Sequence, residues 1–100
     1  HYKFGNDKMK GVAIIGAGGH ARVVAAILRA KNKPILGFFD DSYSQDKVEI
    51  IQGAPLIGSV SSVLNYQDKV SAVYLAIGNN YVRQQVFYFL RQHDFLLPPL

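Results

Sequence analysis

Residues 11–31, with the sequence GVAIIGAGGHARVVAAILRAK, decide the fold of this chain. The stretch begins with a continuous apolar run that ends at Gly16, which predicts a strand buried on both faces, as in a parallel sheet. From His20 to Lys31 the apolar residues recur with helical spacing, which predicts an amphipathic helix. The buried face of that helix is expected to consist of Val23, Val24, Ile27 and Leu28. A buried strand that passes through a glycine turn into a helix is the first half of a βαβ unit.

Two more apolar runs, at 35–40 and 70–77, predict further buried strands. The first helix should end before the nearer run, because Asn32 can adopt a left-handed conformation and the proline that follows cannot continue a helix. The farther run leads into a last helix, which either Asn79 or Asn80 is expected to cap. The buried stripe of the last helix is expected to consist of Val82, Val86, Phe89 and Leu90.

The stretch between these two runs allows more than one assignment. Residues 48–51 and 55–57 can each form a short strand, and we expect 55–57 to be the sheet member. Ser59 should then cap a short helix. Strands that alternate with helices imply parallel, right-handed crossovers. The sequence therefore predicts a Rossmann-like three-layer α/β/α half-fold, with a parallel sheet of about four strands.

Composition restricts the classes of function. The chain has 100 residues, of which 49% are hydrophobic and none is cysteine, so it can form one domain with a real core but no disulfide scaffold. Its formal net charge is +4 with the basic residues scattered, which is too weak a surplus to indicate nucleic-acid binding. No apolar run approaches the roughly 18 residues of a membrane span, so no membrane insertion is expected. The three scattered histidines predict no metal site, and no catalytic grouping follows from the spacing.

The strongest motif is Gly16-x-Gly18-x-x-Ala21, between the predicted strand and helix. Gly16 permits a sharp turn, Gly18 lets a phosphate approach the backbone, and the small Ala21 lets the helix pack closely on the strand. The free amides and the positive dipole end of the helix then favour an anion. The motif, with Gly19 and His20 inside it, predicts the diphosphate site of a nucleotide-type ligand. The alternative is a glycine turn that serves packing alone.

Polar residues follow two other predicted strands. Asp40 and Asp41 can accept hydrogen bonds from ribose hydroxyls or from the edge of a base, or they can simply initiate a turn. Gly78, Asn79 and Asn80 can contact a ligand, cap the last helix, or do both. Ligands in such sheets bind beyond the carboxyl ends of the strands. We therefore expect these residues and the glycine turn to surround one site.

These motifs together resemble one bacterial family. The segments that carry the resemblance are VAIIGAGGHARVVAAIL (12–28), LGFFDD (36–41), GAPLIG with SVSSVL (53–64), AIGNN (76–80) with Arg83, and FLLPPL (95–100). They are similar to the nucleotide-sugar acetyltransferases of the sialic-acid O-acetyltransferase and UDP-N-acetylbacillosamine N-acetyltransferase type. The resemblance covers essentially residues 11–100. One departure is Asn79, because an acidic residue is common in the family at that position.

The resemblance implies a two-domain protein. An N-terminal Rossmann-like domain would bind a UDP-amino-sugar, and a C-terminal left-handed β-helix would bind acetyl-CoA, supply the catalytic histidine and form a homotrimer. By this likeness Gly18, Gly19 and His20 would contact the diphosphate and the sugar. Asp40 and Asp41 would contact the nucleoside. Gly78, Asn79 and Asn80 would line the same pocket.

The resemblance also implies boundaries and a setting. We expect residues 1–8 to be a remnant of expression cloning, residues 9–95 to form the nucleotide-sugar-binding domain, and residues 96–100 to begin a linker to a β-helix that this chain lacks. This domain would hold no cofactor and have no activity alone. Acetyl-CoA would be a co-substrate of a cytoplasmic full-length enzyme, which adds an N- or O-acetyl group in surface glycan biosynthesis.

Two alternatives from other classes stay open at this point. An NAD(P)- or other nucleotide-binding Rossmann module of an oxidoreductase or regulator would also use Gly16 and Asp40. Against it, His20 places a polar side chain at the phosphate turn, and the chain has only half the usual dinucleotide-binding fold. The second alternative is an assembly module without a ligand, which the apolar tail at 95–100 could support.

Overall fold

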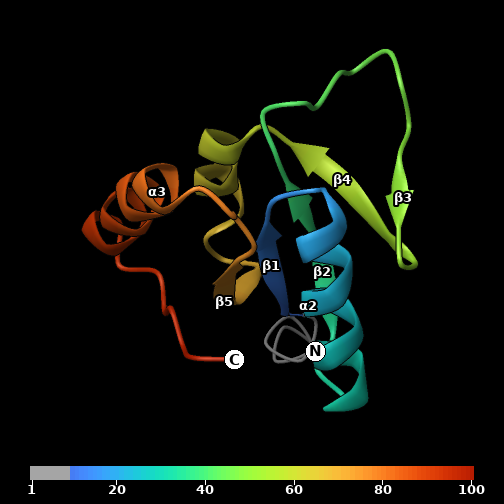
Figure 1. Ribbon diagram of the computed structural model, residues 1–100, viewed down its shortest axis with the longest axis horizontal. Coiled ribbons are helices and arrows are strands. Elements are labelled where there is room, and N and C mark those ends of the chain that lie inside the picture. Colours follow the sequence, from blue (N-terminus) through green and yellow to red (C-terminus); the bar gives the residue numbers. More distant parts are fainter. Residues whose placement is uncertain (1–9) are drawn as a thin grey trace, which may run out of the picture.

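The computed structural model describes residues 10–100, so the remnant expected at 1–8 lies outside the described residues. Strands and helices alternate along the chain as the sequence predicts, except that three strands follow one another without a helix between residues 35 and 58 (Figure 1). In chain order the elements are β1 (Gly11–Ile15), α2 (Gly19–Ala30), β2 (Ile35–Phe39), β3 (Ile50–Ile51), β4 (Ala54–Gly58), the 3₁₀-helix η1 (Val60–Tyr66), β5 (Val70–Leu75) and α3 (Asn80–Gln92).

The strands form one sheet in the order β3-β4-β2-β1-β5. β4, β2, β1 and β5 run parallel to their neighbours, which confirms the predicted parallel sheet and gives the strand order of half a doubly wound fold. Both short strands of the uncertain stretch exist, because β3 pairs antiparallel with β4 and adds a fifth strand at the edge. Gln52 and Gly53 connect them with φ values of 49° and 82°, as a tight two-residue hairpin turn requires.

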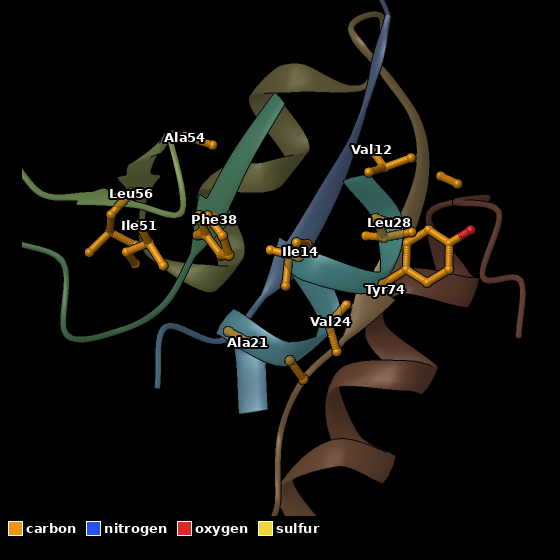
Figure 2. Close-up of a cluster of buried hydrophobic side chains, with 13 residues drawn as sticks. Val12, Ile14, Ala21, Val24, Leu28, Phe38, Ile51, Ala54, Leu56 and Tyr74 are labelled. Carbon is orange, nitrogen blue, oxygen red and sulfur yellow. The ribbon is translucent and has the colours of Figure 1, made fainter. Parts of the chain in front are cut away.

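Helices cover both faces of the sheet, so the three predicted layers are confirmed. Successive side chains of β1 point to opposite faces: Ile14 lies in a cluster with residues of α2, whereas Ile15 lies in a second cluster with residues of η1 and α3. Figure 2 shows the first cluster, in which Val24 and Leu28 of α2 lie over the sheet. Burial on both faces explains why β1 is apolar at every position.

The predicted buried face of α2 is partly wrong. Val24 and Leu28 are buried, but Val23 is 56% exposed and Ile27 is only half-buried. The remaining buried positions belong to two alanines, Ala21 and Ala25, which complete an i, i+3, i+4, i+7 stripe. Small side chains in that stripe let the helix backbone approach the sheet closely. The largest apolar residues therefore did not mark the buried face.

The predicted buried stripe of α3 is also only partly correct. Leu90 is fully buried and Val86 and Phe89 are half-buried against the core, but Val82 is 43% exposed. The core residues of α3 all belong to its second half, so its first turn makes no core contact. The helix then ends at a left-handed residue, Asp94, with a φ of 64°.

Two other helix ends test the predicted caps. Asn32 adopts a φ of 61° directly after α2, which confirms the predicted left-handed stop. Ser59 occupies the N-cap position of η1, as predicted, but its side chain makes no capping hydrogen bond, so that part of the prediction is wrong. Instead, the carbonyl oxygen of Ser59 accepts hydrogen bonds from the N–H of Ser62 at 3.1 Å and from its hydroxyl at 2.6 Å. The acceptor for the first N–H of η1 comes from a distant loop, described below.

The segment after α3 packs against the outer edge of the sheet. Phe95 is buried in the second core cluster, and the carbonyl oxygen of Leu96 accepts a hydrogen bond from the N–H of Val73 in β5 at 2.9 Å. Leu97 packs against the same cluster. This segment therefore covers part of the β5 edge.

Candidate functional site

The strand order defines where a ligand can enter. β1 and β5 are neighbours, but the helices that follow them cover opposite faces, because α2 packs in one core cluster and α3 in the other. The loops after the two strands therefore separate at the carboxyl edge of the sheet (Figure 1). A doubly wound sheet binds ligands in the crevice at such a switch point. The glycine turn and the segment with Gly78 lie on the two sides of this switch point.

Gly16 is required by the fold itself. Its φ is 124°, and a Cβ at this position would lie 2.5 Å from the carbonyl oxygen of Ala76. The N–H of Ala76 in turn donates to the carbonyl oxygen of Ile15 at 2.8 Å. The turn after β1 and the segment after β5 are thus in direct contact. The predicted sharp turn at Gly16 is present, and its glycine is explained without a ligand.

Gly18 and Gly19 differ from Gly16 in that the protein does not require glycine there. Gly18 has an extended backbone with a φ of −92°, and a Cβ at either position would meet no atom within 4 Å. Both residues are exposed at the start of α2. The missing side chains leave open space beside the backbone, which is the space that a phosphate needs.

The first turn of α2 offers unused hydrogen-bond donors next to that open space. Within residues 10–100, the N–H groups of Gly19, His20 and Ala21 donate to no protein acceptor. The first turn also contains no acidic residue that would neutralise the positive end of the helix dipole. His20 is the second residue of the helix, and its ring is exposed. Free amides, an unbalanced dipole and open space are the features that favour an anion at a helix N-terminus.

The segment after β5 adds further donors. Asn79 caps α3, because its Oδ1 accepts a hydrogen bond from the N–H of Val82 at 2.9 Å. Oδ1 of Asn80 accepts one from Nη2 of Arg83 at 2.7 Å. Each amide oxygen thus already accepts one hydrogen bond from α3, and each side chain still has its NH₂ group as a donor. Gly78 has open space where a Cβ would be, like Gly18.

Asp40 and Asp41 each use a carboxylate oxygen to shape the neighbouring backbone. Oδ2 of Asp40 accepts hydrogen bonds from the N–H of Ser42 at 3.0 Å and from its hydroxyl at 2.5 Å, which is the predicted turn. Oδ1 of Asp41 accepts one from the N–H of Val60 at 3.0 Å and so caps η1. A carboxylate has about four acceptor positions. The turn therefore leaves each side chain with free acceptor capacity at the carboxyl edge.

A shallow groove continues from Asp41 between η1 and α3. Its walls combine apolar side chains with three polar groups, and it is lined by Asp41, Val60, Ser61, Gln85, Val86 and Phe89. Sequence reasoning did not single out Ser61 or Gln85. No local pattern marks them, because only packing brings the two helices together.

Arg83 is a third residue that sequence reasoning did not place in the site. Its guanidinium contacts Asn80 and also donates to the carbonyl oxygen of Ile77 at 3.0 Å. The spacing of three residues between Asn80 and Arg83 on a predicted helix was an available signal.

The described residues provide neither a metal site nor a membrane-spanning helix. Residues 10–100 contain no group of three or more His, Cys, Asp or Glu side chains arranged to hold a metal ion. Over the same part of the chain, no helix has the length and apolar character that crossing a bilayer requires. The carboxyl edge of the sheet instead presents backbone N–H donors at the glycine turn and the carboxylate acceptors of Asp40 and Asp41 after β2.

Comparisons with known proteins agree with this fold. A family model described as the PglD N-terminal domain matches residues 11–90. A mutant perosamine N-acetyltransferase from Caulobacter crescentus, solved in complex with CoA and GDP-perosamine, superposes with a TM-score of 0.75 at 33% identity over 87% of this chain. The acetyltransferase domain of PglB from Neisseria gonorrhoeae, solved with acetyl coenzyme A, gives a TM-score of 0.70 at 33% identity over 84% of this chain.

The chain is much shorter than the proteins it matches. It spans 40% of each of these two solved chains. An uncharacterized protein of Acanthamoeba polyphaga mimivirus is 31% identical over 75 residues, which are 75% of this chain and 14% of the viral protein.

Proposed function

We propose, from the premise that this chain belongs to the family of PglD N-terminal domains, that it binds the nucleotide sugar on which a sugar acetyltransferase acts. The observation that carries the proposal is the open space at Gly18 and Gly19 beside unused helix amides. Neither position needs glycine for a turn or for packing, unlike Gly16. A backbone kept bare next to free donors is suited to contact with an anionic ligand.

The distribution of donors and acceptors suggests how the ligand would lie. The diphosphate would bind at the start of α2, where the N–H groups of Gly19 and His20 are free. The NH₂ group of Asn79 could add a donor from the other side of the crevice. The nucleoside would extend towards Asp40 and Asp41, whose free carboxylate positions can accept from hydroxyl or base N–H groups. His20 would help to orient the ligand.

The proposal for the whole protein goes further. It would be an acetyltransferase that transfers an N- or O-acetyl group to an amino sugar on a nucleotide carrier, for surface glycan biosynthesis in the cytoplasm. Acetyl-CoA would be its co-substrate, bound outside this domain, and the assembly would be a homotrimer. The complexes of the related acetyltransferases with CoA, acetyl coenzyme A and GDP-perosamine support this proposal. They do not favour the oxidoreductase or regulator alternative.

Calorimetric titration of the chain with UDP, GDP, a UDP-amino-sugar and NAD tests the binding proposal. We expect saturable binding of at least one nucleoside diphosphate and tighter binding of its sugar conjugate. NAD also contains a diphosphate, but its second nucleoside occupies the position of the sugar, so it should bind more weakly. Binding of NAD alone would favour the oxidoreductase or regulator alternative. Binding of none of the four compounds would refute a nucleotide site in this chain.

A further inference from the structure

One side chain from the first turn of α3 holds the segment that precedes the helix. Nη1 of Arg83 donates to the carbonyl oxygen of Ile77 at 3.0 Å, and Nη2 donates to Oδ1 of Asn80 at 2.7 Å. The backbone N–H of Arg83 donates to the carbonyl oxygen of Asn79 at 2.9 Å. Of residues 77–80, Arg83 therefore contacts all except Gly78.

Gly78 is the residue of this segment with the greatest backbone freedom. It is exposed, and a Cβ at its position would meet no atom within 4 Å. Glycine has more backbone freedom than any other residue, so an exposed glycine without packing contacts does not fix its own conformation. The guanidinium of Arg83 donates hydrogen bonds on both sides of it, to Ile77 and to Asn80, and so bridges the segment that contains Gly78 and Asn79.

The chemistry of arginine suits this task. A guanidinium presents several N–H donors in one rigid plane and can bind two separate acceptors at once, whereas the ammonium group of lysine is a single point charge on a flexible stem. Arg83 also leaves the neighbouring Asn79 free to cap the helix through Val82. The guanidinium therefore contacts Ile77 and Asn80, and it leaves intact the capping bond between Val82 and Asn79.

We propose that Arg83 is a positioning residue. It fixes the Gly78–Asn79 segment in the shape that receives the ligand, and it does not itself touch the ligand. The role rests on the proposed function, because it assumes a ligand in the crevice between β1 and β5. The segment after β5, which contains Gly78 and Asn79, adjoins the glycine turn, because a Cβ at Gly16 would lie 2.5 Å from the carbonyl oxygen of Ala76. Ordering a mobile loop upon binding lowers affinity, so a turn that is already fixed binds more tightly.

The test compares the binding of UDP and GDP to the wild-type chain and to Arg83→Met, Arg83→Lys and Arg91→Met, by calorimetry. Arg91 is the matched control, because it lies on the same helix and its guanidinium stacks on Phe87 with 5.6 Å to the ring centroid. For the nucleotide that binds the wild type more tightly, Arg83→Met should weaken binding by about tenfold or more, as expected for the loss of charged hydrogen bonds. Arg83→Lys should restore only part of the affinity, and Arg91→Met should bind like the wild type.

Two further readouts separate positioning from other roles. Thermal unfolding identifies a temperature at which every variant is folded. If Arg83 served fold stability alone, the nucleotide affinities of the variants measured at that temperature would equal that of the wild type. The salt dependence of binding separates positioning from direct contact with a phosphate. We expect the same dependence in Arg83→Met as in the wild type, whereas a shallower one would mean that Arg83 binds the ligand and would overturn the proposal.

The possible failures are distinguishable. If the wild type binds neither nucleotide, the proposed function fails and the role of Arg83 fails with it. If the wild type binds and Arg83→Met binds equally well, only the role of Arg83 is refuted. The amide resonances of Gly78 and Asn79 should move or broaden in Arg83→Met, and unchanged resonances would likewise refute a fixed turn.

Discussion

The carboxylate of Asp41 accepts a hydrogen bond from the backbone N–H of Val60 at 3.0 Å, although 19 residues separate the two along the chain. The bond joins the loop after β2 to the start of η1, where the side chain of Ser59 makes no capping bond. Asp41 is therefore the cap of a short helix as well as a candidate ligand residue. The two roles can be measured separately, because one changes the free energy of unfolding and the other changes the dissociation constant.

Asp41→Ala should lower the free energy of unfolding by about 1 kcal/mol, because the N–H of Val60 loses its acceptor. Urea unfolding followed by circular dichroism measures the change. Asp46→Ala is the control, since Asp46 is exposed in the same loop and its carboxylate accepts no hydrogen bond from any described residue. Equal unfolding midpoints for the two variants would contradict the capping role.

Gly16→Ala should lower the stability of the fold far more than Gly18→Ala. At Gly16 the methyl group would meet the carbonyl oxygen of Ala76 and the backbone would keep its positive φ, so the variant should lose about 1–3 kcal/mol. At Gly18 the backbone is extended and the space is open, so stability should change little. Thermal unfolding of both variants gives the comparison. Similar losses at both positions would show that the whole turn is structural.

Gly18→Val should abolish nucleotide binding and leave the fold largely intact. The branched side chain would fill the open space beside the free amides, where the phosphate is proposed to lie. Calorimetry measures binding, and the two-dimensional amide spectrum reports the fold. Ala26→Val adds the same side chain at an exposed position in α2 and should bind like the wild type. A folded Gly18→Val chain with wild-type affinity would contradict the phosphate site.

The Asp40→Ala/Asp41→Ala double variant should weaken binding of a UDP-sugar more than binding of free pyrophosphate, because the carboxylates are proposed to contact the nucleoside. Each lost charged hydrogen bond should cost about 1.5–3 kcal/mol. The comparison is made at a temperature where the variant is folded, since Asp41 also caps η1. Equal losses for the two ligands would place the pair elsewhere in the site.

The chain alone should have no acetyltransferase activity. Acyl transfer from a thioester needs a positioned acyl donor and a base at the attacking amine or hydroxyl. Among residues 10–100, His20 is the one histidine at the candidate site, and its place at the phosphate turn suits ligand binding. The measurement is thiol release from acetyl-CoA in the presence of UDP-amino-sugars, compared with the uncatalysed rate. Turnover that disappears in His20→Ala would instead move the chemistry into this domain.

The sequence was most informative where the physical cause is local. An apolar run, a glycine turn and an amphipathic helix follow one another in residues 11–31, and the structure has β1, the turn and α2 there. Asn32 and Asn79 end and begin helices as predicted, because capping depends on the side chain and on a few neighbouring backbone groups. The stripes of α2 and α3 were less predictable. Val23 and Val82 are apolar but exposed, since helix position on the sheet depends on the whole packed core.

The sequence by itself determined the alternation of strands and helices and the glycine turn, because backbone conformation and periodic burial follow from residues close together in the chain. Only the tertiary structure decided how the three glycines differ. Gly16 is fixed by its contact with Ala76, whereas Gly18 and Gly19 face open space. It also decided that Asp41 caps η1 and that two helices form the groove beside it. Contacts between residues so far apart depend on the parallel sheet that brings the strand ends to one edge, and no local pattern encodes them.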